Sequence, residues 1–273
     1  MEPRKYALLT GATTKKGIGY AIALQLLAQG YGIILVGRKT ETLQDIAESL
    51  EHNDKKKVFF ITQDLAASDA VAFIIKEVDE LVRKENIRID VLINNAGFVL
   101  EGDFLKNTQR DIRAMILVHV MNLALLTWHF AGRMRTQNFG RIMNTSSVMG
   151  FTPVPFNALY AATKAFAIIL SYSLSWEMKH VHKTDVRVIA ICPGATETEF
   201  WKRAKYQNAF LFTNLRFMIM ESDDFAKKAV EMMFKGKRIY IPGVYNRILV
   251  FIARYFPRPV PAYLAAFLMK NRG

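Results

Sequence analysis

Seven short runs of strand-like composition recur along the chain, and stretches of helical length with one apolar face lie between them. The runs are residues 6–10, 32–37, 57–62, 89–94, 140–146, 186–192 and 238–242. Strands that alternate with helices pair in parallel, because each connecting helix returns the chain to the same edge of the sheet. The alternation therefore predicts an α/β fold, a doubly wound parallel sheet of about seven strands with helices on both faces.

Length and composition indicate one domain. At 273 residues the chain can bury a large core, and no repeat, low-complexity tract or Pro/Gly linker divides it. Cys192 is the only cysteine and lies in an apolar run, so we predict a core residue, no internal disulfide and a reducing compartment. A strand begins by residue 6 and leaves no room for a signal peptide, which favours the cytoplasm. The five histidines have no ligand spacing with acidic residues, and we predict no metal site.

A glycine-rich turn follows the first run, and a helical pattern begins at Tyr20. This order is typical of a pyrophosphate site, because glycines let the backbone approach the phosphates and the helix start supplies unpaired N–H groups. A second strand-like run follows at 32–37, as a mononucleotide-binding half requires. The cofactor contacts expected in the turn are Gly11, Thr14, Lys15, Lys16, Gly17, Ile18 and Gly19.

Tyr160 and Lys164 are four residues apart in a segment of helical pattern, which places them on one helix face. The ammonium group can then lie beneath the phenol. A free tyrosine has a pKa of roughly 10, and a nearby positive charge is expected to lower that pKa toward the working range. Ser147 ends the apparent strand 141–147 and can face both side chains.

Six motifs in order resemble those of the short-chain dehydrogenase/reductase family, in the branch that holds carbonyl, 3-oxoacyl and hydroxysteroid reductases. They are Thr10-Gly-x5-Gly17-x-Gly19, Asp64-Leu65, Asn94-Asn-Ala-Gly97, Ser147, Tyr160-x3-Lys164 and Pro193-Gly194-x3-Thr198. The motifs cover residues 6–200, and the resemblance implies one Rossmann-fold catalytic domain over residues 1–273. One departure is that five residues, rather than three, separate the first two glycines. This leaves open which of Thr13, Thr14, Lys15 and Lys16 faces the cofactor.

Longer glycine loops also occur in the enoyl-reductase branch of that family, where six residues separate tyrosine and lysine. Position 157 is Asn, so that arrangement is absent and carbonyl reduction is favoured.

The resemblance also implies the catalytic roles. Tyr160 protonates the carbonyl oxygen as hydride arrives, Ser147 hydrogen-bonds the same oxygen, and Lys164 stabilises the phenolate and bridges the nicotinamide ribose hydroxyls. Asn122 holds a water for the proton relay; alternatively, its amide satisfies a backbone group of its own helix. The thirteen-residue spacing to the tyrosine selects Ser147 over Ser146.

Charge at the end of the second strand bears on the choice of cofactor. NAD-selective sites usually have an acidic residue there, whereas this chain has Arg38, which can fork onto a 2′-phosphate. We therefore expect NADP(H) in preference to NAD(H); the alternative is that Arg38 and Lys39 merely begin a solvated helix. Asp64 matches an adenine-contacting aspartate, or it caps the next helix. The remaining implied cofactor contacts are Leu65, Asn95, Ala96, Gly97, Tyr160, Lys164, Pro193, Gly194, Thr196 and Thr198.

Two segments bear on substrate and location. Residues 199–220 are rich in large apolar side chains and stand where the family has its substrate lid. An apolar lid suits an apolar ketone such as a 3-oxoacyl thioester or a steroid. The alternative is that these side chains pack on the protein's own core. The tail, about 245–273, has two short apolar helices near 245–256 and 260–270, both too short for a membrane span. After Glu231 the chain has eight basic residues and no acidic one. Such a tail suits contact with an anionic membrane, a dimer partner or the active-site mouth.

The sequence thus predicts an NADP(H)-dependent oxidoreductase that reduces an apolar ketone or runs the reverse reaction. Family habit favours a homodimer or homotetramer. Nucleic-acid binding is not expected, because the basic residues of the tail lie among bulky apolar ones and the sequence has no nucleic-acid-binding motif. The alternative is a non-catalytic NADP(H)-binding redox sensor, which has no requirement for Ser147, Tyr160 and Lys164.

Overall fold

The computed structural model describes residues 2–54, 57–100, 102–194 and 220–269. The strands are β1 (Arg4–Thr10), β2 (Gly32–Gly37), β3 (Val58–Thr62), β4 (Ile87–Asn94), β5 (Phe139–Thr145), β6 (Asp185–Ile191) and β7 (Ile239–Tyr240). The α-helices are α1 (Ile18–Ala28), α2 (Thr40–Asp54), α3 (Ala70–Glu85), α4 (Gln109–Ile116), α5 (Asn122–Thr136), α6 (Ala158–His180), α9 (Ser222–Phe234), α10 (Val244–Tyr255) and α11 (Pro259–Met269). Three short turns are helical: the 3₁₀ turns η1 (Phe104–Lys106) and η3 (Val148–Phe151), and the π turn η2 (Leu117–Met121).

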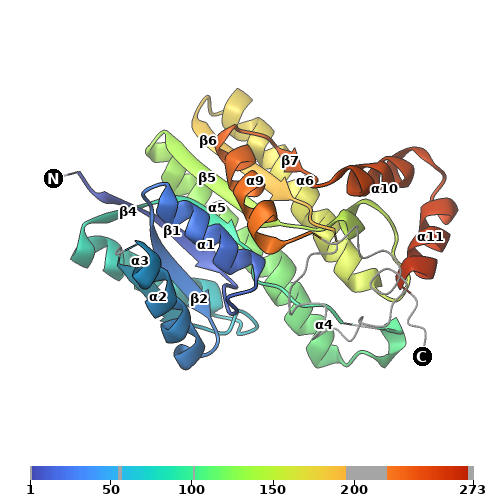
Figure 1. Cartoon of the computed structure of the whole chain (residues 1–273), viewed down its shortest axis with the longest axis horizontal. Coiled ribbons are helices and arrows are strands. Elements are labelled where there is room, and N and C mark those ends of the chain that lie inside the picture. The colour runs from blue at the N-terminus through green and yellow to red at the C-terminus, as the bar shows by residue number, and fades with distance from the viewer. Residues whose placement is uncertain (1, 55–56, 101, 195–219, 270–273) are drawn as a thin grey trace.

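The strands form one parallel sheet in the order β3-β2-β1-β4-β5-β6-β7, which confirms the predicted doubly wound architecture (Figure 1). The chain leaves β1 toward β2 on one side and returns to β4 on the other. In α/β sheets the crevice at such a switch point, at the carboxyl ends of the strands, is where ligands bind. The register brings Thr10 beside Asn94, and Asn94 beside Asn144, at this edge.

The core lies on both faces of the sheet, which explains why the strands read as continuous apolar runs. Neighbouring residues of β1 point to opposite faces. Leu9 packs in a cluster with residues of α1, α2 and α9, whereas Leu8 packs in a second cluster with residues of α3 and α5. Both leucines are fully buried. Alternation along each strand therefore fixes which helices cover which face.

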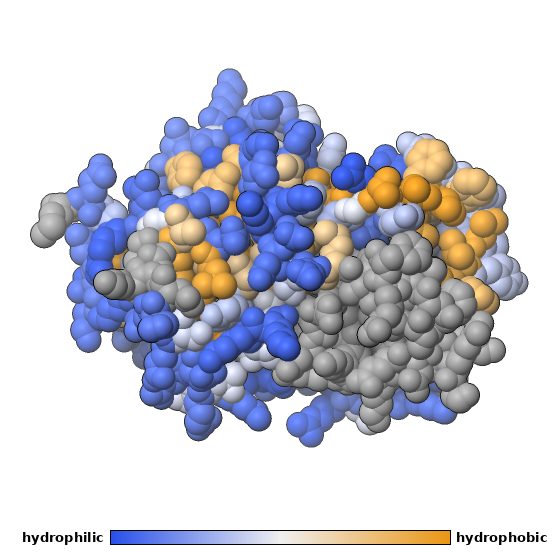
Figure 2. All heavy atoms as spheres, in the orientation of Figure 1, coloured by the Kyte–Doolittle hydropathy of each residue, from blue (hydrophilic) through white to orange (hydrophobic). Residues whose placement is uncertain are grey.

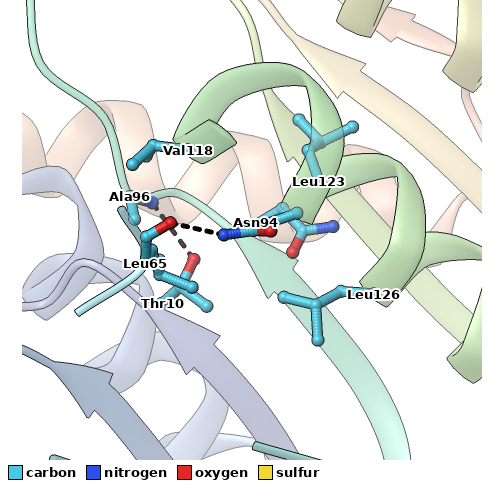
Figure 3. Close-up of a pocket in the computed structure, with 8 residues that line it drawn as sticks. Thr10, Leu65, Asn94, Ala96, Val118, Leu123 and Leu126 are labelled. Atoms are coloured by element: carbon cyan, nitrogen blue, oxygen red, sulfur yellow. Dashed lines mark hydrogen bonds between the residues drawn. The ribbon is translucent and has the colours of Figure 1, made fainter. Parts of the chain in front are cut away.

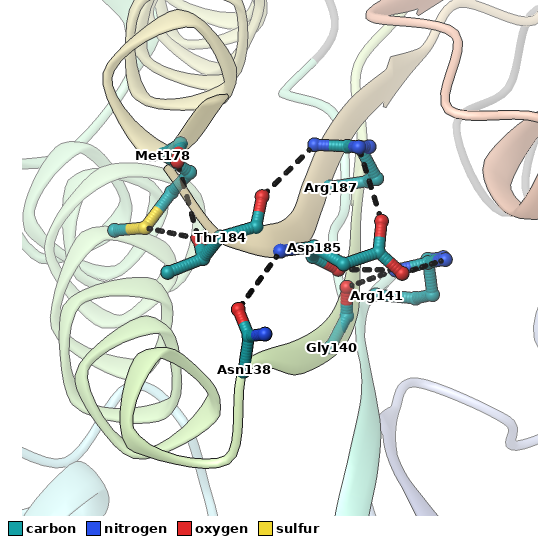
Figure 4. Close-up of polar contacts among 7 residues, drawn as sticks. All are labelled: Asn138, Gly140, Arg141, Met178, Thr184, Asp185 and Arg187. Carbon is teal, nitrogen blue, oxygen red and sulfur yellow. Dashed lines mark hydrogen bonds and ion pairs between the residues drawn. The ribbon is translucent and has the colours of Figure 1, made fainter. Parts of the chain in front are cut away.

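An ion-pair network ties β5 to β6 at the amino ends of these strands (Figure 4). The Arg141 guanidinium is almost fully buried and pairs with the Asp185 carboxylate at 3.0 Å, and Arg187 pairs with the same carboxylate at 3.0 Å. Arg141 also donates to the backbone oxygens of Gly140 and Asp185. These contacts lie at the edge opposite the carboxyl ends, so they stabilise the sheet without lining the crevice.

Two helical stretches, Gln109–Thr136 and Ala158–His180, are long and apolar enough to cross a membrane by length and composition alone. In the fold α5 packs on β4 and β5, and α6 packs on β5 and β6. Packing on the sheet accounts for the part of their apolar character that is buried. The helices α10 and α11 lie at one end of the molecule, away from the sheet (Figure 1).

Candidate active site

The glycine turn crosses the carboxyl end of β4 at close range. Gly11 has φ +80°, and a Cβ there would lie 2.5 Å from the Cα of Ala96, so only glycine fits. The Thr10 hydroxyl accepts hydrogen bonds from the backbone N–H groups of Asn95 and Ala96, each at 3.1 Å. The Asn95 amide donates to the Gly11 carbonyl at 3.0 Å. These contacts fix the predicted Asn95–Ala96 segment against the turn.

Helix α1 begins where the predicted pyrophosphate site requires it. Gly17 is the N-cap and has no side chain to occupy the first N–H groups, and the first turn of α1 holds no acidic residue. A Cβ at Gly19 would lie 2.8 Å from the Asn95 amide nitrogen, so the helix start packs tightly on the β4 edge. Ile18 is the first residue of α1. The uncapped N–H groups and the positive helix end suit an anion.

The lengthened turn separates its two lysines. Lys15 pairs with Asp45 of α2 at 2.9 Å, although both side chains are about half exposed and the pair adds little stability. The Lys16 carbonyl accepts a hydrogen bond from Ser222, and the Thr14 carbonyl accepts one from the Gly17 N–H. Lys16 therefore lies on the side of α9, and Lys15 lies on the side of α2.

Arg38 and Asp64 follow β2 and β3 at the same edge. Arg38 is exposed and makes no ion pair with any residue that the structure describes, so its guanidinium is accessible to a ligand. The Asp64 carboxylate accepts from the Ala66 N–H at 2.9 Å and holds a turn. Helix α3 has Asp69 as its N-cap, so the alternative that Asp64 caps this helix is wrong.

Ser147, Tyr160 and Lys164 come together in the buried interior of the crevice. The Ser147 hydroxyl lies close enough to the Tyr160 phenol to affect its pKa, and it donates to the Pro193 carbonyl at 3.4 Å. Lys164 Nζ lies 5.4 Å from the centroid of the Tyr160 ring and donates to the Thr145 carbonyl at 2.9 Å. The Ser146 hydroxyl points elsewhere and donates to the Lys164 carbonyl at 2.7 Å. The expected constellation is thus assembled, with Ser147 rather than Ser146 beside the phenol.

Ser147 does not end a strand as expected. Strand β5 ends at Thr145, and Ser147 is the N-cap of η3, where its hydroxyl accepts from the Met149 N–H at 3.2 Å. The β-propensity of the run 141–147 gave no sign of this cap. The cap orients the serine hydroxyl toward α6, because it fixes the start of η3 against that helix.

Burial dominates the titration of the pair. It raises the pKa of the Tyr160 phenol, and the hydrogen bond from Ser147 lowers that pKa only in part. Burial lowers the pKa of Lys164 to about 8. The expected depression of the phenol pKa by Lys164 is therefore wrong for this arrangement. The physical reason is that the ammonium group donates to the Thr145 carbonyl and the phenol is wholly desolvated.

Asn122 is the first residue of α5, directly after the π turn. Its amide donates to the Leu65 carbonyl at 2.5 Å, so the alternative that it serves its own helix is wrong. The two residues line a small cavity with Thr10, Asn94 and Ala96, where β1 and β4 end (Figure 3). The contact joins α5 to the Asp64–Leu65 segment, and the predicted water relay through Asn122 stays a prediction.

His119 is a site residue that the sequence reasoning missed. It lies in η2 and is almost fully buried, edge-on to the Tyr160 ring at 5.8 Å between centroids. Its Nε2 accepts from the Phe98 N–H at 2.9 Å, so Nδ1 carries the proton and lies 3.1 Å from the Thr163 hydroxyl. That hydroxyl donates to the Tyr160 carbonyl. A π turn has no simple sequence signature, although such turns are frequent at functional sites.

Of the remaining predicted residues, some are packed against neighbouring side chains and others lie outside the described residues. Gly97 is packed against His119, and Gly194 is packed against Asn246 of α10. Cys192 is buried, as predicted, and burial raises the pKa of its thiol to about 12. Thr196, Thr198 and residues 199–219 of the expected lid lie outside the described ranges. Within those ranges no group of three His, Cys, Asp or Glu side chains is placed to hold a metal.

The chain is similar to known proteins in both sequence and fold. A family model described as short chain dehydrogenase matches residues 5–209. The 3-oxoacyl-[acyl-carrier-protein] reductase FabG of Aquifex aeolicus is 32% identical over 195 residues, which are 71% of this chain and 75% of that protein. The 7beta-hydroxysteroid dehydrogenase of Clostridium sardiniense is 27% identical over 243 residues, 89% of this chain and 87% of that protein. A short-chain dehydrogenase from Sphingobium yanoikuyae, solved in complex with NADPH, is 30% identical, covers 89% of both chains and gives a TM-score of 0.76.

Proposed function

Because the chain belongs to the short-chain dehydrogenase family, we propose that it is an NADP(H)-dependent oxidoreductase that interconverts a ketone and a secondary alcohol. The observation that carries this proposal is the buried contact between the Tyr160 phenol and the Ser147 hydroxyl, with Lys164 on the same helix face. A protein that only senses the dinucleotide has no requirement for these three side chains in one place.

The residues at the carboxyl edge fit a dinucleotide. Gly11 lets the turn pass close to Ala96, where a side chain would not fit, and the uncapped start of α1 suits a pyrophosphate. The relative from Sphingobium yanoikuyae binds NADPH, which supports the same cofactor here. Arg38 supports NADP(H) over NAD(H), because its accessible guanidinium follows β2, where a 2′-phosphate would need a fork-shaped donor.

In the reducing direction the bound cofactor supplies hydride to the carbonyl carbon. Tyr160 donates its phenolic proton to the carbonyl oxygen, and the Ser147 hydroxyl holds that oxygen by a hydrogen bond. The raised pKa of the phenol keeps it protonated and ready to donate. Lys164, whose pKa is lowered to about 8, can return a proton near neutral pH. Asn122, at the start of α5, is proposed to hold the water that links this lysine to solvent.

An apolar ketone such as a 3-oxoacyl thioester or a steroid is the proposed substrate. The two named relatives act on an acyl carrier thioester and on a hydroxysteroid, which supports this class. Phe104, Leu105 and Phe156 are exposed apolar residues on the segments that follow β4 and precede α6. Phe156 has φ +66°, a strained conformation for a bulky residue, four positions before Tyr160. We propose that these side chains contact the substrate. We also propose that the protein is cytoplasmic and has peripheral contact with a membrane.

The test pairs two adjacent serines. The purified protein is assayed for NADPH oxidation against 3-oxoacyl thioesters of increasing chain length and a series of steroid ketones. Ser147→Ala should lower kcat by about a hundredfold or more, the usual effect of losing an oxyanion donor. Ser146→Ala is the matched control and should retain most of kcat, since its hydroxyl bonds a backbone carbonyl. Tight NADPH binding without turnover of any ketone would instead favour the redox sensor.

We also propose a homodimer, or a homotetramer built from it, through α5 and α6. These helices contact one another, and each exposes large apolar residues at helical spacing. The residues are Leu125 and Trp128 on α5 and Ile169, Tyr172 and Trp176 on α6. A self-complementary apolar face of this kind suits a two-fold contact with a second copy. Trp128→Glu should halve the mass measured by light scattering, and an unchanged mass would contradict this interface.

A further inference from the structure

Helices α10 and α11 expose two apolar stripes that the catalytic proposal does not use. Each stripe has the spacing of one helix face. The stripe residues are Val244, Ile248, Phe251 and Tyr255 on α10 and Val260, Tyr263 and Phe267 on α11. They are between 47% and 79% exposed, and we call them the tail surface. Figure 2 shows apolar side chains gathered over these helices at one end of the molecule, whereas polar side chains cover much of the other coloured surface in this view.

The opposite side of α10 is anchored beside the active site. Asn246 and Val250 are its buried residues, and the Asn246 amide donates to the Pro242 carbonyl at 2.8 Å. Asn246 also packs against Gly194, three residues after the end of β6, and α10 contacts η3, which begins after Ser147. The tail surface therefore faces outward from a helix whose inner side touches the walls of the crevice.

The charges around the tail surface are of one sign. Arg247, Arg254 and Arg258 lie on or between the two helices, and the chain has no acidic residue after Glu231. The Arg254 guanidinium lies 5.9 Å from the centroid of the Tyr255 ring. Each basic residue near an anionic membrane surface contributes about 1 kcal/mol of attraction, and tyrosine favours the headgroup level. Apolar stripes, tyrosines and arginines together are typical of a helix that lies in a membrane interface.

We infer that α10 and α11 dock on an anionic lipid bilayer and thereby hold the entrance of the Ser147–Tyr160 crevice at the lipid surface. The docking surface stands on the exposed stripes and their charges. The delivery of substrate from lipid rests on the proposed function, because only an apolar ketone would be held in the bilayer. Apolar contact area and electrostatic attraction act together, so binding should weaken at high salt.

The binding experiment uses the full-length protein and sedimentation with vesicles. The vesicles contain phosphatidylcholine alone or phosphatidylcholine mixed with phosphatidylglycerol. The parent should sediment with the mixed vesicles and much less with phosphatidylcholine. Phe251→Glu should weaken this binding by about tenfold or more. Phe73→Glu, which adds the same charge at an exposed phenylalanine of α3, is the matched control and should bind like the parent.

Three results would overturn the docking surface. The first is a parent protein that does not sediment with the anionic vesicles. The second is a Phe251→Glu variant that binds these vesicles as tightly as the parent. The third is a lower oligomer mass for Phe251→Glu, which would assign the stripe to a contact with a second copy of the chain. Thermal unfolding and NADPH affinity of each variant, measured without lipid, must match the parent. If Phe251→Glu fails to fold, Arg254→Glu tests the same surface from its polar side and should weaken binding to the anionic vesicles.

The delivery experiment compares two ketones with the same enzyme. A long-chain ketone is presented within anionic vesicles, and a short ketone is supplied in water. Phe251→Glu should slow turnover of the first by about tenfold and leave the second unchanged. Equal slowing of both, or of neither, would overturn delivery from lipid. A parent that reduces neither ketone refutes the proposed function and delivery, while the sedimentation result still decides the docking surface.

Discussion

His119 joins the segment after β4 to the helix that carries Tyr160, and its replacement should disturb catalysis through position. Its Nε2 accepts from the Phe98 N–H, and Nδ1 lies 3.1 Å from the Thr163 hydroxyl, which donates to the Tyr160 carbonyl. The ring also packs edge-on against the phenol. His119→Ala removes these contacts together, whereas His119→Gln can restore one acceptor or one donor.

The size of the effect follows from the contacts. Each hydrogen bond contributes about 1 kcal/mol net, and a buried N–H left without an acceptor costs about 1–3 kcal/mol. We therefore expect His119→Ala to lower the free energy of unfolding by about 2–4 kcal/mol, part of it from the cavity that remains. A displacement of the Tyr160 phenol by about 1 Å would lower kcat by about a hundredfold. The KM of the ketone should change far less, since the contacts of His119 hold the Tyr160 ring and the backbone of α6.

Steady-state NADPH oxidation and thermal unfolding measure the two effects separately. His119→Gln should recover a large part of kcat, which a purely packing role would not predict. If His119→Ala loses stability yet keeps kcat within about threefold of the parent, the positioning role is refuted.

The same histidine predicts how stability depends on pH. Burial and the Lys164 ammonium hold the pKa of His119 well below its usual range. The unfolded chain therefore binds a proton near pH 6.5 that the folded protein does not bind, and stability should decrease as the pH falls below about 6.5. His119→Gln should show a smaller decrease in chemical denaturation; an unchanged slope would contradict the buried neutral ring.

Three further outcomes are expected. Arg38→Asp should weaken NADPH binding by about tenfold or more and NADH binding much less, measured by fluorescence titration; equal losses would contradict the cofactor assignment. Because the pKa of Lys164 is lowered to about 8, kcat should fall as the pH rises through that value. A kcat that stays constant up to about pH 9.5 would show that the lysine charge is not needed. Asp185→Ala should lower the free energy of unfolding by about 1–2 kcal/mol, because the buried Arg141 loses its carboxylate partner. Its kcat should equal that of the parent, and a lower kcat would mean that this distant network affects the active site.

The strand pattern predicted the architecture well because the parallel strands are buried on both faces. Such strands are continuous apolar runs, and their alternation with helices leaves few arrangements of the sheet. The last strand was the least accurate, since β7 covers only Ile239–Tyr240 of the expected run 238–242. An edge strand pairs on one side alone, so its ends are set by neighbours rather than by its own composition.

Short-range spacing predicted which side chains come together, but it did not predict their pKa values. The four-residue interval between Tyr160 and Lys164 fixes their shared face in any helix. The cap at Ser147 and the π turn at His119 depend on tertiary contacts with α6, which spacing does not encode. The pKa of the phenol was predicted in the wrong direction, because charge proximity can be read from sequence whereas complete desolvation cannot.

Single-turnover reduction by Tyr160→Phe tests the central claim most directly. Phenylalanine keeps the ring that packs on His119 and removes only the hydroxyl that meets Ser147. With NADPH bound before the ketone is mixed in, hydride transfer should be slower by about a thousandfold, while NADPH affinity stays unchanged. A rate within about tenfold of the parent, at equal NADPH occupancy, would contradict the role of Tyr160 as the proton donor.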